Sequence, residues 1–175
     1  MFQFRNDYSV GAHPQVLAAL SATNLEGNIG YGADEYCAKC AQLIRELCQA
    51  PQADVQFLIG GTQANFTAIA AFLRPWEGVL CAESAHINGH EGGAVEATGH
   101  KLFQVKTGPE GKLVPALLEP VMEACRDPHM VKPALVYISN ATETGGVYTL
   151  GELEDLSAYC KKEGLLLFLD GARLG

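Results

Sequence analysis

A stretch of small and polar residues after the apolar run 55–59 has the composition of a phosphate-binding loop. It reads Gly60-Gly61-Thr62-Gln63-Ala64-Asn65 and leads directly into a segment with helical periodicity. Backbone N–H groups and a hydroxyl would then lie at the positive end of a helix dipole, which favours anions. An ordinary glycine-containing turn accounts for the same residues equally well. The stretch matches neither the Walker loop nor the G-x-G-x-x-G pattern of dinucleotide-binding folds.

A histidine follows the second apolar run, 79–82, in a loop of small and polar residues. His86 could stack on an aromatic ligand or transfer a proton. His86 and His90, with Glu91 beside them, could instead form a helical metal site. Asn88-Gly89 weakens a helix between the two histidines and no third ligand is evident, so we predict no metal here. We assign His90 no role.

A carboxylate and a guanidinium follow the last apolar run, 165–169. The sequence Asp170-Gly171-Ala172-Arg173 places a charge at the rim of a buried core, where a carboxylate needs a cationic partner. Arg173 itself is one candidate partner. The alternative is the protonated ring nitrogen of a ligand, which would leave Arg173 free to bind a carboxylate through two hydrogen bonds.

Alternating strands and helices must position these groups. Periodicity and capping residues predict helices at 14–23, 34–49, 63–73, 91–98, 114–125 and 150–163, and strands at 55–59, 79–82, 102–105, 134–139 and 165–169. Apolar strands separated by helices favour parallel pairing and right-handed crossovers. We therefore predict an α/β protein with three α/β/α layers and a mostly parallel sheet, whose ligand site lies at the carboxyl ends of the strands.

The composition is that of a globular protein with one well-buried domain, because 48% of the 175 residues are hydrophobic and 18% are charged. The net charge of -8, with scattered basic residues, argues against a nucleic-acid or anionic-membrane partner. The start of the chain lacks the features of a signal peptide, and no apolar run is long enough to cross a bilayer. We therefore expect a cytoplasmic location.

The cysteines are expected to be reduced core residues, because most of them fall on apolar helix faces or in strands. Cys37 and Cys40 have the C-x-x-C spacing of metal and redox sites. No second pair completes a zinc site, and helical periodicity explains the spacing by core packing. The six cysteines are Cys37, Cys40, Cys48, Cys81, Cys125 and Cys160.

Taken together, in this order and at these separations, the segments 60–65, His86 and 170–173 resemble the threonine aldolase and beta-eliminating lyase group of fold-type-I pyridoxal phosphate enzymes. The likeness covers nearly the whole chain, beginning at Phe4-Arg5-Asn6-Asp7 and including Gly30-Tyr31-Gly32-Ala33-Asp34. The resemblance implies the large domain of such an enzyme and pyridoxal 5′-phosphate as its cofactor.

The resemblance also implies a role for each motif. Gly61 and Thr62 would contact the cofactor phosphate, His86 would stack on the pyridine ring, and Asp170 would pair with the ring nitrogen. Arg173 would bind the substrate carboxylate or the ring oxygen of the cofactor. A carboxylate at the ring nitrogen keeps the ring protonated, so that it can accept electrons from a bond broken at the substrate α-carbon.

Further positions match the family more loosely. Asn6 would contact the substrate carboxylate, although many members have serine there. His129 would reach the substrate hydroxyl, although Asp127-Pro128-His129 also reads as a surface turn. Glu91 falls near positions that carry polar contacts in the family. The segment 139–146 differs from its counterpart, which leaves the identity of the substrate open.

The activity implied by the resemblance is that of an aldolase, which cleaves a β-hydroxy-α-amino acid such as L-threonine to glycine and an aldehyde. Beta-elimination from an amino acid with a leaving group is the alternative within the same chemistry, and a non-catalytic fragment is the alternative outside it. A metal-binding module built on Cys37, Cys40, His86 and His90 would instead predict stoichiometric zinc. The resemblance implies a homodimer or homotetramer at full length, with Tyr31 in a segment that approaches the neighbouring subunit's site.

In the family, the lysine that binds the cofactor covalently follows the Asp-Gly-Ala-Arg segment by a few tens of residues. We expect none of the lysines of this chain to replace it (Lys39, Lys101, Lys106, Lys112, Lys132, Lys161 and Lys162). Residues 1–175 are therefore predicted to comprise an N-terminal arm and part of the cofactor-binding large domain, without the small C-terminal domain and without activity of their own.

Overall fold

The computed structural model describes residue 6 and residues 8–174, and the chain divides into two compact units, one up to Phe57 and one from Leu58 onward. The first unit contains α1 (Pro14–Thr23) and α2 (Glu35–Leu47). Asp34 caps α2 as predicted, because its Oδ1 accepts the N–H of Cys37 at 2.9 Å. No residue of α1 is buried, and α2 buries only Ala41.

The run 55–59, predicted to be a strand, does not form one. Its residues have no regular structure, and the side chain of Ile59 is almost fully exposed. A strand requires a hydrogen-bonded neighbour. Between residues 8 and 174 the strands pair only with one another, and none of them pairs with this run.

These four strands form one parallel sheet in the second unit. They are β1 (Glu77–Ala82), β2 (Leu102–Val105), β3 (Lys132–Ser139) and β4 (Leu166–Asp170), in the order β2-β1-β3-β4. Because the chain moves from β1 to β2 and then returns to β3 on the other side of β1, the direction of winding reverses between β1 and β3. In open α/β sheets, ligands bind at the carboxyl ends of the strands near this reversal.

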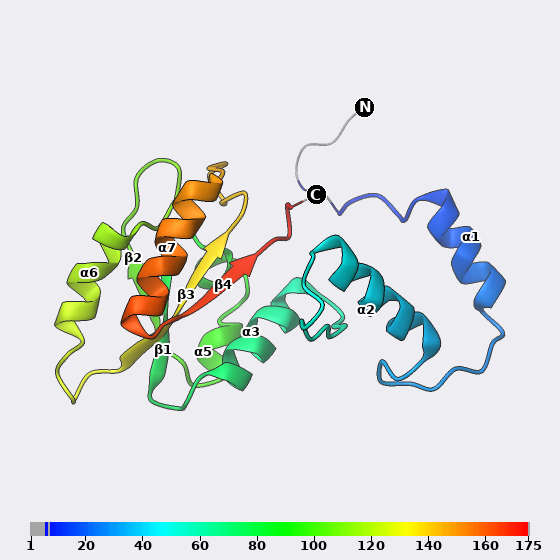
Figure 1. Cartoon of the computed structure of the whole chain (residues 1–175), viewed down its shortest axis with the longest axis horizontal. Helices are drawn as coiled ribbons and strands as arrows, with labels where there is room; N and C mark the ends of the chain where they lie inside the picture. Colours follow the sequence, from blue (N-terminus) through cyan, green and yellow to red (C-terminus); the bar gives the residue numbers. More distant parts are fainter. Residues whose placement is uncertain (1–5, 7, 175) are drawn as a thin grey trace. The chain divides into compact units, whose positions relative to one another are not determined.

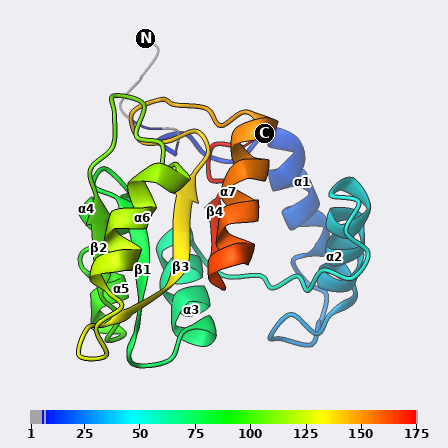
Figure 2. The same ribbon diagram turned by 60° about the vertical axis from the view of Figure 1, so that its left-hand side comes forward.

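Helices cover both faces of the sheet, which confirms the predicted three layers. Figure 2 shows α6 and α7 on one face, where α6 packs against β2 and α7 against β4. On the other face α3 packs against α5 (Figures 1 and 2). The helices of this unit are α3 (Gly61–Phe72), α4 (His86–Gly89), α5 (Ala94–Ala97), α6 (Pro115–Ala124) and α7 (Leu150–Glu163).

Local sequence accounts for the limits of the longest helix. Thr149 and Glu152 form a capping box at the start of α7, in which each side chain binds the backbone of the other residue. Gly164 ends the helix with a φ of 69°, a left-handed conformation that glycine adopts without strain. In the described part of the chain, no helix has the length and apolar character needed to span a bilayer.

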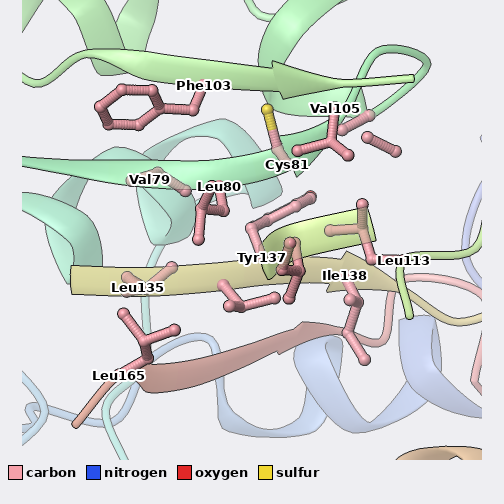
Figure 3. Packing of buried hydrophobic residues seen from close by; sticks show 14 of the residues in the cluster. Val79, Leu80, Cys81, Phe103, Val105, Leu113, Leu135, Tyr137, Ile138 and Leu165 are labelled. Atoms are coloured by element: carbon pink, nitrogen blue, oxygen red, sulfur yellow. The ribbon is translucent and has the colours of Figure 1, made fainter. Parts of the chain in front are cut away.

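The core lies between the sheet and its helices. Figure 3 shows side chains from β1, β2 and β3 packed together with Leu165, which directly precedes β4; they include Val79, Leu80, Leu135 and Tyr137. Leu118 of α6 and Leu156 of α7 are fully buried in the same cluster. The strands read as continuous apolar runs because helices cover both of their faces.

The cysteines only partly follow their prediction. All six are free; Cys81 and Cys160 are buried, and burial raises the pKa of Cys81 to about 12 and that of Cys160 to about 11. The prediction of core packing is wrong for Cys40 and Cys48, whose side chains are exposed. Cys37 and Cys125 are half-buried. The periodicity of α2 does indicate an apolar face, but the first unit has too few packed elements to bury it.

Replacing Gly78 of β1 with alanine should lower the free energy of unfolding by about 1–3 kcal/mol through overpacking. A Cβ at this position would lie 2.6 Å from the carbonyl oxygen of Lys101, which cannot move freely because it accepts the N–H of Val79. Urea unfolding followed by circular dichroism measures the change. The control is Gly151→Ala on α7, where a Cβ meets nothing within 4 Å, and where we expect no loss. Equal stability of Gly78→Ala and the parent would contradict the predicted clash.

Candidate active site

Asp170, the last residue of β4, lies at the carboxyl edge of the sheet and accepts three hydrogen bonds. Its Oδ1 accepts the N–H of Ala172 at 3.0 Å. Its Oδ2 accepts the hydroxyl of Tyr137 at 2.5 Å and the side-chain amide of Asn65 at 3.3 Å. Hydrogen bonds donated to a carboxylate stabilise its ionised form and fix its orientation.

Tyr137 is buried in β3, and its ring stacks on Phe168 with a centroid distance of 5.4 Å. Burial, together with the hydrogen bond to Asp170, raises the pKa of Tyr137 far above that of an exposed tyrosine. The hydroxyl therefore keeps its proton and remains a donor to Asp170 at any physiological pH.

His86 is the first residue of the short helix α4, where the sequence predicted a loop. Its Nδ1 lies 2.8 Å from Oε1 of Glu91, whose side chain is completely buried, whereas that of His86 is 37% exposed. A carboxylate accepts hydrogen bonds and does not donate them, so the proton of a neutral His86 ring belongs on Nδ1. Nε2 is then the nitrogen that is free to exchange a proton.

Asn65 of α3 joins these two groups. Its Nδ2 donates to Oε1 of Glu91 at 2.7 Å as well as to Oδ2 of Asp170 at 3.3 Å. The network therefore runs from Tyr137 through Asp170, Asn65 and Glu91 to His86. It connects four segments that are far apart in the sequence.

The start of α3 leaves its first N–H groups available. Gly60 is the N-cap residue and provides no side-chain hydrogen bond to the helix. A Cβ added at Gly60 or Gly61 would meet nothing within 4 Å, so this end of the helix is open. Asn65 follows Gly61 by one helical turn, which is about 6 Å along the axis. The start of α3 that carries Gly61 and Thr62 is thus close to the carboxylate network.

Arg173 does not pair with Asp170 in the described part of the chain. Its Nη1 lies 3.8 Å from Oε1 of Glu143 and 3.4 Å from the carbonyl oxygen of Ala141. The sequence offered Arg173 and a ligand's ring nitrogen as partners of the Asp170 carboxylate, and the prediction of Arg173 as the partner is therefore wrong. Donors of the chain itself, Tyr137 and Asn65, occupy Oδ2 instead. The guanidinium of Arg173 is partly exposed, which leaves it accessible to an anion.

Two further residues, Asn6 and His129, were predicted to contact the substrate. Asn6 belongs to the first unit, where its Oδ1 accepts the hydroxyl of Ser9 and the N–H of Tyr8. His129 precedes β3 at the amino end of the sheet, roughly 20 Å along the strand from the carboxyl edge. Its side chain is 92% exposed and binds Asp127. The structure does not bring His129 to the network within this chain, and the roles of Asn6 and His129 stay predictions.

The alternative of a metal site gains no support from the geometry. The rings of His86 and His90 are tilted, with centroids 5.6 Å apart. Across residues 8–174, three or more His, Cys, Asp or Glu side chains do not gather at any point as a metal ion would require.

Sequence reasoning missed the roles of Asn65 and Tyr137, although both left a signal. Asn65 interrupts an otherwise apolar face of α3, and a buried amide must find partners. Tyr137 places one hydroxyl in an apolar strand, and a buried tyrosine hydroxyl usually finds an acceptor. Their partners are 26 to 105 residues away, so the pairing itself could not be read from the sequence.

Comparison with known proteins agrees with this geometry. The beta-eliminating lyase family model matches residues 3–175. The low specificity L-threonine aldolase of Pseudomonas aeruginosa is 38% identical over 173 residues, which are 98% of this chain and 49% of that protein. The low specificity L-threonine aldolase of Saccharomyces cerevisiae is 28% identical over 177 residues, which are 97% of this chain and 44% of that protein.

A solved structure of a threonine aldolase from Leishmania major is 54% identical and superposes with a TM-score of 0.94. The match covers 97% of this chain and 49% of that one. The chain thus spans about half the length of these relatives. The family model matches almost the whole length of the chain, including the parallel strand β4 that ends in Asp170. The chain therefore belongs to the beta-eliminating lyase family.

Proposed function

We propose that the protein is a pyridoxal-phosphate-dependent carbon–carbon lyase that cleaves a β-hydroxy-α-amino acid such as L-threonine to glycine and an aldehyde. The observation that carries this proposal is the carboxylate of Asp170, held by three donors at the same sheet edge as His86. The names of the relatives, which are L-threonine aldolases, support the choice of substrate.

The residues at this edge fit the cofactor. An ionised carboxylate has about four lone-pair sites, and Asp170 uses three of them, so one remains for a ring N–H. The open start of α3 offers uncapped N–H groups to a phosphate. Oε2 of Glu91 is buried without a partner among the described residues, so Glu91 keeps one acceptor that no donor of the described chain uses.

In this proposal each residue has one task. Gly61 and Thr62 would hold the phosphate, and His86 would stack on the ring, with Nε2 free to exchange a proton with the substrate hydroxyl. Asp170 would keep the ring nitrogen protonated, and Arg173 would bind the substrate carboxylate. The cofactor, when bound, supplies a sink for the electrons of the broken Cα–Cβ bond.

Beta-elimination is the second candidate, favoured by the name of the family. The same residues would serve it, because both reactions send electrons from the α-carbon to the ring. The products distinguish the two reactions: an aldehyde and glycine from an aldolase, and a keto acid from an eliminating lyase. We further propose a cytoplasmic homodimer or homotetramer for the whole protein, with Tyr31 close to the neighbouring subunit's site.

The proposal gives this chain the non-covalent contacts of the cofactor. Lys112 is the one lysine of the seven that is not exposed. It pairs with Glu152 at 3.0 Å and Glu110 at 3.3 Å, and these partners raise the pKa of its ammonium. A lysine that holds its proton is a poor nucleophile, so Lys112 is not expected to bind the cofactor covalently.

Titration of the purified chain with pyridoxal phosphate, followed by absorbance, tests the proposal. We expect saturable binding that borohydride does not convert into a covalent adduct at one lysine. Pyridoxal without its phosphate should bind at least about tenfold more weakly, because it forfeits the charged contacts at the start of α3. A single borohydride-fixed lysine would overturn the non-covalent assignment, and an absence of saturable binding would overturn the cofactor site.

A further inference from the structure

We infer that Asn65 is a positioning residue whose one amide group holds Asp170 and His86 in a fixed relation to each other. The inference deepens the proposed function and rests on it for what these two groups contact when a ligand is bound. The geometry of the network itself does not depend on any ligand.

The amide of Asn65 has two N–H groups and meets two carboxylates. Nδ2 donates to Oε1 of Glu91 at 2.7 Å and to Oδ2 of Asp170 at 3.3 Å. Asn65 is only 3% exposed, so water cannot easily replace either bond. A single planar group therefore sets the separation of the two carboxylates.

The absence of charge on this group matters. Two carboxylates that share one side chain repel each other, and donors placed between them offset part of that repulsion. A lysine or arginine at this position would also neutralise Asp170. Asn65 donates to both carboxylates without adding charge, so the negative charge of Asp170 stays available to a cationic ring nitrogen.

The second effect of Asn65 reaches His86 through Glu91. Oε1 of Glu91 accepts from Asn65 and lies 2.8 Å from Nδ1 of His86. The hydrogen bond from Asn65 fixes the carboxylate of Glu91. The bond between Glu91 and His86 then fixes the orientation of the imidazole ring and keeps a proton on its Nδ1. Asn65 thus acts on both ends of the network, whereas Tyr137 contacts Asp170 and not Glu91 or His86.

The test compares Asn65→Leu with Tyr137→Phe, because the first removes the centre of the network and the second removes one end. Long-range ¹H–¹⁵N NMR of the ligand-free protein reports which nitrogen of His86 carries the proton. We expect a dominant Nδ1–H form in the parent and in Tyr137→Phe, and a shift toward the Nε2–H form in Asn65→Leu. Glu91→Gln serves as the positive control for a changed His86 signal.

The dissociation constant of pyridoxal phosphate is the second measurement. It should rise by about tenfold or more in both Asn65→Leu and Tyr137→Phe, because each loses a hydrogen bond to a charged group. Ile69→Val, a buried change on the same helix outside the network, controls for loss of stability and should leave both measurements unchanged. If Asn65→Leu does not fold, Asn65→Ser replaces it, because one hydroxyl can donate to only one of the carboxylates.

An unchanged His86 signal in the Asn65 variant, with a changed signal in Glu91→Gln, would overturn the inference. So would an effect of Tyr137→Phe on His86 equal to that of Asn65→Leu. Failure of the proposed function looks different: the parent would then bind no pyridoxal phosphate, while its His86 would still show the Nδ1–H form.

Discussion

Replacement of Asp170 with asparagine should weaken pyridoxal phosphate binding by about 30-fold or more. Truncating one partner of a hydrogen-bonded charge pair typically costs about 2–5 kcal/mol, and each 1.4 kcal/mol is about a factor of ten in affinity. The substitution keeps the shape of the side chain, removes its charge and replaces one acceptor oxygen with a donor amide. Oδ1 can still accept the N–H of Ala172, and the new amide nitrogen in place of Oδ2 can donate to the hydroxyl oxygen of Tyr137, so we expect the local structure to persist.

The matched control is Asp155→Asn on α7, which removes the same charge from an exposed position outside the network. Absorbance titration of both variants separates a local pairing with the ring nitrogen from a general effect of net charge. Parent-like affinity in Asp170→Asn would show that this carboxylate does not face the ring nitrogen. Equal weakening in both variants would point to net charge alone.

The largest expected effect on stability is that of Leu156→Ala, which should lower the free energy of unfolding by about 2–5 kcal/mol. Leu156 is fully buried where α7 packs against the sheet, and its loss leaves a cavity that the close-packed core cannot fill. Chemical denaturation followed by circular dichroism measures the difference.

Leu150→Ala provides the comparison for this result. Leu150 begins the same helix but is 73% exposed, so the same substitution there should change stability by less than about 0.5 kcal/mol. Similar losses at the two positions would mean that α7 does not pack on the sheet through Leu156.

The fold was predictable where short-range pattern and long-range packing agree. The run 134–138 is apolar because β3 is covered on both faces, and the capping box at Thr149 marks the start of α7. The run 55–59 is mostly apolar as well, but periodicity cannot tell whether a neighbouring strand exists. The predicted helix 91–98 is in fact only the short α5, because Gly92 and Gly93 adopt positive φ angles of 62° and 75°.

The sequence indicated which strand ends form the site, but it did not indicate which side chains contact one another there. The sequence order of Thr62, His86 and Asp170 was enough to indicate a common edge, because parallel strands end at the same side of a sheet. It did not indicate that Arg173 turns to Glu143, or that Tyr137 and Asn65 take its place at Asp170. Such pairings depend on side-chain geometry across neighbouring strands and helices.

The position of β4 at the end of the sheet order also sets a sequence of events in folding. Among the described residues β4 pairs only with β3, so it adds to the sheet after β3 has formed, and the bond of Asp170 to Asn65 closes a loop of 105 residues. Contacts of such long sequence separation are entropically costly and form late. We therefore expect the network around Asp170 to assemble late in the folding of the unit that begins at Leu58, so that ligand binding there reports the complete folding of this unit.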